Sequence, residues 1–106
     1  MSALVVFCTC PDAASAEHIA RRLVDERLAA CVNRVPGLRS VYRWRGEVRD
    51  DAEELLVIKT QRARLEALTA RILELHPYEL PEVIALDVTA GHAPYLAWLA
   101  RESAAP

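Results

Sequence analysis

Glycine is scarce in this sequence, with three residues among 106. The glycine-based signatures of nucleotide-binding proteins and hydrolases are absent: there is no Gly-x-Gly-x-x-Gly, no P-loop and no Gly-x-Ser-x-Gly. Apolar runs are short, and none approaches the ~18 residues of a transmembrane helix. We therefore expect no phosphate-cradling loop of the usual kind and no membrane insertion.

A strong excess of either charge is also missing, since the net charge is −2 and the pI is about 5.9. A dedicated nucleic-acid binder usually carries a basic excess, so we expect no nucleic-acid partner. Residues 1–11 lack a basic segment and a small-residue cleavage site, and we interpret them as mature protein. Three cysteines are an odd number, which favours reduced thiols in the cytoplasm over a disulfide framework.

The length and the 53% hydrophobic content predict one domain over residues 1–106. A continuous apolar run predicts a buried strand at 4–10, and apolar residues at helical spacing predict a helix from Asp12 to about Arg27. Further strands are expected at residues 29–35, 38–45 and 53–60. Pro36-Gly37 is expected to form a bulge between the first two of these strands, and residues 46–51 the end of a hairpin.

After the hairpin, we expect Thr60 to cap a second helix that Pro77 ends. Residues 83–88 are predicted to form the last strand, and Pro94 to begin a short C-terminal helix. The resulting order is β-α-β-β-α-β-α. It predicts an α+β fold, a ferredoxin-like βαββαβ sandwich with an antiparallel sheet plus the short C-terminal helix.

Cys8 and Cys10 are the candidate metal ligands that spacing alone provides. Residues two apart in a strand face the same side, and two thiolates on one side would suit Cu(I) or Zn(II). The spacing is not that of structural zinc sites, and the histidines at 18, 76 and 92 are scattered. The alternative is that the cysteines act as small buried hydrophobes.

A nucleophilic cysteine with a histidine is formally possible from Cys8 or Cys31 with His76. Strand cysteines usually act as buried apolar residues, so we expect that the protein is not an enzyme.

Tyr42-Arg43-Trp44-Arg45 interleaves aromatic and basic side chains, as RNA-stacking surfaces do. Four acidic residues across the predicted hairpin would neutralise these arginines: Asp50, Asp51, Glu53 and Glu54. We therefore expect the aromatic residues to pair within the hairpin or to contact another subunit.

Seven segments distributed over nearly the whole chain resemble, in order, the CutA family of divalent-cation-tolerance proteins. They are Val6–Asp12, Glu26–Asn33, Val35–Gly37, Tyr42–Glu47, Lys59-Thr60, His76–Glu82 and Tyr95–Leu99. The resemblance implies a ferredoxin-like protomer, a homotrimer similar to PII-type signalling proteins, and a non-enzymatic role in tolerance of copper and other divalent cations.

The resemblance also implies a copper site at Cys8 and His76. The family has a histidine pair just before Pro-Tyr, and the first member of that pair is Leu75 here. Cys10 is a nearby thiol that could compensate. An alternative function is a PII-like sensor that binds a small anionic ligand in clefts between subunits, where the arginines at 39, 43 and 45 would lie.

The predicted hairpin has edges that a monomer would leave exposed, and exposed edges favour pairing with other chains. Threefold closure would cover them and would stop further growth. We therefore expect a homotrimer with Tyr42 and Trp44 at the subunit contacts.

Overall fold

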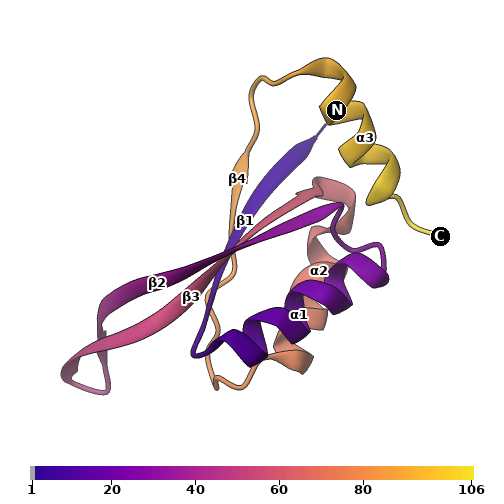
Figure 1. The fold of residues 1–106 in the computed structure, drawn as a ribbon. Coiled ribbons are helices and arrows are strands. Elements are labelled where there is room, and N and C mark those ends of the chain that lie inside the picture. Colours follow the sequence, from indigo (N-terminus) through magenta and orange to yellow (C-terminus); the bar gives the residue numbers. More distant parts are fainter. Residues whose placement is uncertain (1) are drawn as a thin grey trace.

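The computed structural model describes residues 2–106, which form four strands and three α-helices (Figure 1). In chain order the elements are β1 (Ala3–Cys10), α1 (Ala13–Asp25), β2 (Cys31–Trp44), β3 (Glu47–Gln61), the 3-10 turn η1 (Arg62–Arg64), α2 (Leu65–Leu75), β4 (Ile84–Asp87) and α3 (Ala93–Glu102).

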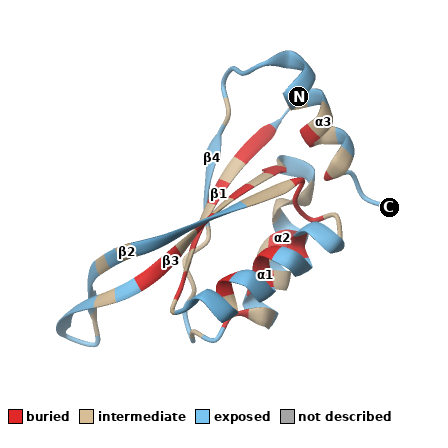
Figure 2. Ribbon diagram, viewed as in Figure 1, coloured by how far each residue is buried: buried red, intermediate tan, exposed pale blue. Residues whose placement is uncertain are grey.

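The strands form one antiparallel sheet in the order β2-β3-β1-β4, and α1 and α2 cover one of its faces (Figure 1). This arrangement confirms the predicted α+β, ferredoxin-like fold. The core lies between the sheet and these two helices, where Figure 2 shows the buried residues. Its largest fully buried side chains include Leu4, Ile19, Leu23, Leu56, Ile58, Leu68 and Ile72.

The ends of α1 show why the helix forms where the pattern predicts it. The Asp12 carboxylate accepts a hydrogen bond from the Ser15 amide at 2.8 Å, which satisfies one of the free amides of the first turn. Glu17 and Arg21, which are four residues apart on the helix, form an ion pair on the solvent side at 3.8 Å. The chain leaves the helix through Arg27, whose φ of 60° lies in the left-handed region.

The β2–β3 hairpin is longer than the sequence predicts. β2 continues through the bulge between Val35 and Leu38, and the polar residues 47–51 belong to β3 and not to the turn. Backbone pairing extends through this polar part, and exposed ion pairs form across it, as between Arg39 and Asp50 at 2.9 Å. The distal half of the hairpin projects beyond the helices (Figure 1).

The predicted capping role of Thr60 is wrong. Thr60 lies within β3, and its buried hydroxyl donates to the carbonyl of Leu28 at 2.7 Å. A buried hydroxyl needs a hydrogen-bond partner, and this long-range carbonyl supplies it. The helical segment begins later, with η1, and Gln61 precedes it without a side-chain cap.

The sheet face opposite α1 and α2 is largely uncovered. α3 packs over one end of it through Leu99, against Ala3 and Ala30. Elsewhere on this face, which we call the open face, apolar side chains are exposed on the outer strands: Val35, Ile84 and Leu86. The last strand is also shorter than predicted, and all four residues of β4 are exposed (Figure 2). Over residues 2–106, no helix has the length and apolar character needed to cross a membrane.

Candidate metal centre

Cys8, Cys10 and His76 come together at the end of β1. The side chains of the two cysteines face the helices and are fully buried, whereas Thr9 between them faces the other side of the sheet. His76 follows the last residue of α2 and is 7% exposed. One side-chain donor atom from each residue lies within 4.8 Å of the other two. The structure thus places Cys8 and His76 close to each other, together with Cys10, which the spacing along the strand also made a candidate.

Backbone groups hold the ring of His76 on both sides. Its Nε2 lies 2.8 Å from the carbonyl oxygen of Thr9, and its Nδ1 lies 3.1 Å from the amide nitrogen of Tyr78. A carbonyl can only accept and a backbone amide can only donate a hydrogen bond. The neutral ring therefore carries its single proton on Nε2, donates it to Thr9, and accepts from Tyr78 at Nδ1.

The two thiols differ in acidity because each acts on the other. The neighbouring Cys10 thiol and burial raise the pKa of Cys8, and the nearby carboxylates of Glu82 and Glu53 raise it further. The Cys8 thiol lowers the pKa of Cys10 against the effect of burial, and His76 lowers it more. Cys10 is therefore the stronger acid of the pair. Since the thiolate is the form that binds metals, Cys10 is poised to act as a ligand.

The pKa of His76 is subject to opposing effects. Burial lowers it, while the neighbouring Cys10 thiol and the Thr9 carbonyl raise it, and the net direction is upward.

Two sulfurs and one imidazole are a donor set for soft or borderline ions. Thiolates favour Cu(I) and Zn(II) over Mg²⁺ and Ca²⁺, which prefer oxygen ligands. Copper is consequently compatible with the residues present, and Cys8, Cys10 and His76 are the residues that would hold it. The structure brings neither His18 nor His92 to this site, and both are exposed. Cys31 is half-buried on β2 and also lies outside the cluster.

A groove lies on the open face beside this site, between the distal hairpin and residues 77–82. Its volume is about 730 Å³, and its lining includes Tyr42 and Trp44 on the hairpin and Tyr78 and Glu82 opposite. The Tyr78 hydroxyl donates to the buried carboxylate of Glu53 at 2.6 Å. Sequence reasoning missed this contact, because 25 residues separate the partners and no local pattern links them.

The arginines predicted to bind an anion are partly engaged in ion pairs. Arg39 pairs with Asp50 at 2.9 Å, and Arg45 pairs with Glu79 at 2.8 Å. The groove that contains Arg43 also contains Glu53 and two further carboxylates. This charge balance favours an anionic ligand less than the sequence alone suggests.

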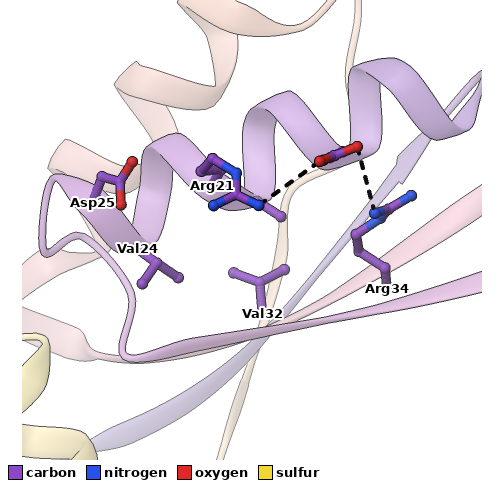
Figure 3. A pocket seen from close by; sticks show the side chains of 7 residues that line it. Arg21, Val24, Asp25, Val32 and Arg34 are labelled. Atoms are coloured by element: carbon purple, nitrogen blue, oxygen red, sulfur yellow. Dashed lines mark ion pairs between the residues drawn. The ribbon is translucent and has the colours of Figure 1, made fainter.

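A smaller hollow of about 270 Å³ lies between α1 and β2 (Figure 3). Val24 and Val32 contribute apolar surface to it, and Glu17 lies between Arg21 and Arg34, with ion-pair distances of 3.8 and 4.0 Å. Arg34 also pairs with the buried Glu54 at 2.6 Å. The charges of this hollow thus neutralise one another and fasten the helix to the edge strand.

Comparison with known proteins shows to which family the chain is similar. The model of the family described as "CutA1 divalent ion tolerance protein" matches residues 4–102. The chain is 52% identical to the divalent-cation tolerance protein CutA of Thermus thermophilus over 95 residues, which covers 90% of this chain and 92% of that protein. It is 50% identical to the chloroplastic protein CutA of Arabidopsis thaliana over 96 residues, or 91% of this chain.

The chain spans about half the length of several curated relatives, with 53% of the Arabidopsis protein covered. Solved structures agree over nearly the entire chain. CutA from Xylella fastidiosa superimposes with a TM-score of 0.95 at 46% identity, covering 98% of this chain and all of that one. The Thermus thermophilus protein gives a TM-score of 0.93 at 49% identity, with 94% and 97% covered. The chain belongs to the CutA1 divalent ion tolerance family.

Proposed function

We propose that this protein takes part in tolerance of divalent metal ions by binding copper at Cys8, Cys10 and His76, without catalysing a reaction. The observation that carries the proposal is the convergence of two buried thiols and one imidazole within 4.8 Å of one another. The family membership supports the role in ion tolerance, because the relatives carry that role in their names.

The absence of a catalytic role is part of the proposal. Both thiols of the site are fully buried, so a substrate larger than an ion would not reach them. A reactive cysteine is usually partly exposed.

We also propose that the protein acts in the cytoplasm as a homotrimer. A reducing compartment would keep the thiols of Cys8 and Cys10 available for a metal. The open face and the projecting hairpin support assembly, because exposed apolar strands favour contact with further copies of the chain.

Copper titration of the purified protein under reducing conditions tests the metal site. With a competing Cu(I) chelator, Cys8→Ser should lower the affinity more than His76→Ala, because a thiolate is the stronger ligand for Cu(I). We expect His76→Ala to lower the Cu(I) affinity, and Cys8→Ser and Cys10→Ser to lower it more.

Cys31→Ser is the matched control, since it removes a thiol outside the cluster. Affinities that are unchanged in Cys8→Ser, Cys10→Ser and His76→Ala would contradict the proposed site. Equal losses in Cys8→Ser and His76→Ala would contradict the ranking of the ligands.

A further inference from the structure

In the arrangement that the structure shows, neither nitrogen of His76 is free to bind a metal. Nε2 carries the ring proton and faces the Thr9 carbonyl, and the lone pair of Nδ1 accepts from the Tyr78 amide. A metal requires a ring nitrogen with an available lone pair. His76 is therefore close to both thiols, but it can act as a ligand only after the hydrogen bond from the Tyr78 amide is broken.

We propose that Tyr78 is a latch on this site: its backbone amide occupies Nδ1 of His76, and metal binding must release residues 77–82 from the hairpin. This inference rests on the proposed function, and it concerns how occupancy of the same site is transmitted to the surface.

The release follows whichever ring nitrogen binds the metal. If Nδ1 binds it, the metal takes the lone pair that now accepts from the Tyr78 amide, and the proton stays on Nε2. If Nε2 binds it, the single ring proton must sit on Nδ1, where it would point at the Tyr78 amide proton, and two donors cannot share a hydrogen bond. The Tyr78 amide must turn away, and the 3.1 Å contact is lost.

Tyr78 connects this movement to the hairpin. Its hydroxyl donates to Glu53 of β3 at 2.6 Å, and its ring lies 4.7 Å from that of His76 between centroids. The next residue, Glu79, pairs with Arg45 in the hairpin turn at 2.8 Å. Residues 77–82 are thus tied to the hairpin at two points, and a turn of the Tyr78 backbone strains both of them.

The alternative is that Tyr78 helps His76 to bind metal, as supporting residues around metal sites usually do. The two possibilities predict opposite effects of Tyr78→Phe on the affinity for the metal. If Tyr78 is a latch, Tyr78→Phe removes the anchor at Glu53 and makes metal binding stronger. If Tyr78 supports the ligand, the same substitution makes metal binding weaker.

The first measurement is the tautomer of His76 in the metal-free protein, read from nitrogen-15 NMR of the ring. We expect a protonated Nε2 and an unprotonated Nδ1 in the wild type. Cu(I) affinity should rise about fivefold in Tyr78→Phe, the equivalent of one ordinary hydrogen bond. Tyr42→Phe is the matched control: it breaks the Tyr42–Asp51 hydrogen bond of 2.5 Å in the same groove and should change neither quantity.

The second measurement is amide hydrogen exchange over residues 77–82. Adding Cu(I) should accelerate exchange in the wild type and leave it unchanged in His76→Ala. A protonated Nδ1 in the metal-free wild type, weaker binding in Tyr78→Phe, or copper binding without faster exchange would each overturn the latch. If the wild type binds no Cu(I), the proposed function fails, and the latch fails with it.

Discussion

At the scale of single residues, Cys31 tests whether a cysteine outside the cluster contributes to metal binding. It is half-buried at the start of β2, opposite Lys59, and it lies close enough to Tyr95 to contribute, after burial, to a raised pKa of that hydroxyl. We expect Cys31→Ala to lower the free energy of unfolding by about 0.5–1 kcal/mol through lost packing, and to leave Cu(I) affinity unchanged. Urea unfolding and the chelator competition measure the two effects. A loss of copper affinity would place Cys31 within the site.

The residues of the candidate metal centre show how much of the site can be predicted from the sequence. Alternation along one apolar strand is enough to place Cys8 and Cys10 on the same side. The position of His76 at the end of a helix is also predictable, but its approach to the end of β1 depends on how α2 packs on the sheet. No local pattern indicates that the Tyr78 amide fixes the ring of His76 or that Glu53 anchors Tyr78. Those contacts exist only after folding.

At the scale of elements, the hairpin turn depends on one glycine. Arg45 and Gly46 have φ values of 50° and 81°, the pattern of a two-residue turn whose twist matches the flanking strands. A Cβ at Gly46 would meet no atom within 4 Å, so only backbone strain opposes a side chain there. We expect Gly46→Ala to destabilise the protein by about 1 kcal/mol, measured by urea unfolding.

Gly46→Asn is the informative companion, because asparagine tolerates the left-handed region better than alanine. It should lose less stability than Gly46→Ala. Equal losses in both variants would mean that the turn is not the cause.

The elements that the sequence predicts poorly are those held by distant partners. Apolar periodicity is sufficient for β1 and α1. Residues 47–51 are mostly polar and lack the alternation of a half-buried strand, so only pairing such as Arg39–Asp50 shows that they extend β3. Thr60 fits a helix cap by residue type, yet its hydroxyl reaches Leu28, 32 residues away. In both cases a tertiary contact overrides the local preference.

At the scale of the whole molecule, the shape of the chain bears on the proposed trimer. Its principal extents are 44 × 26 × 22 Å, and the projecting hairpin contributes to the elongation. Most of the open face has no helix over it, and β4 is exposed at the sheet edge (Figure 2). A latch that acts on the hairpin would therefore act on the surface that is best suited to contact other copies. Metal occupancy and assembly would then be linked through residues 77–82.

Trp44 is the residue that tests the trimer most directly. It is only partly buried in the protomer, lies on the groove side of β2 with Tyr42, and its ring is 5.3 Å from the Arg45 guanidinium carbon. Large aromatic side chains at the centre of an interface often provide much of its binding energy. We expect Trp44→Ala to weaken the trimer by about 2–4 kcal/mol. Val41→Ala is the matched control, because Val41 lies on the same strand but faces the other side, and it is 69% exposed.

Sedimentation velocity at micromolar concentration, repeated over a dilution series, measures the change. The wild type and Val41→Ala should remain trimeric at concentrations at which Trp44→Ala dissociates. The exposed Arg39–Asp50 pair should matter little, because solvent screens it and ordering both side chains costs entropy. A wild-type protein that sediments as a stable monomer of 11.8 kDa would contradict the proposed assembly. Dissociation of Val41→Ala together with Trp44→Ala would instead show that loss of folding, and not loss of an anchor, separates the subunits.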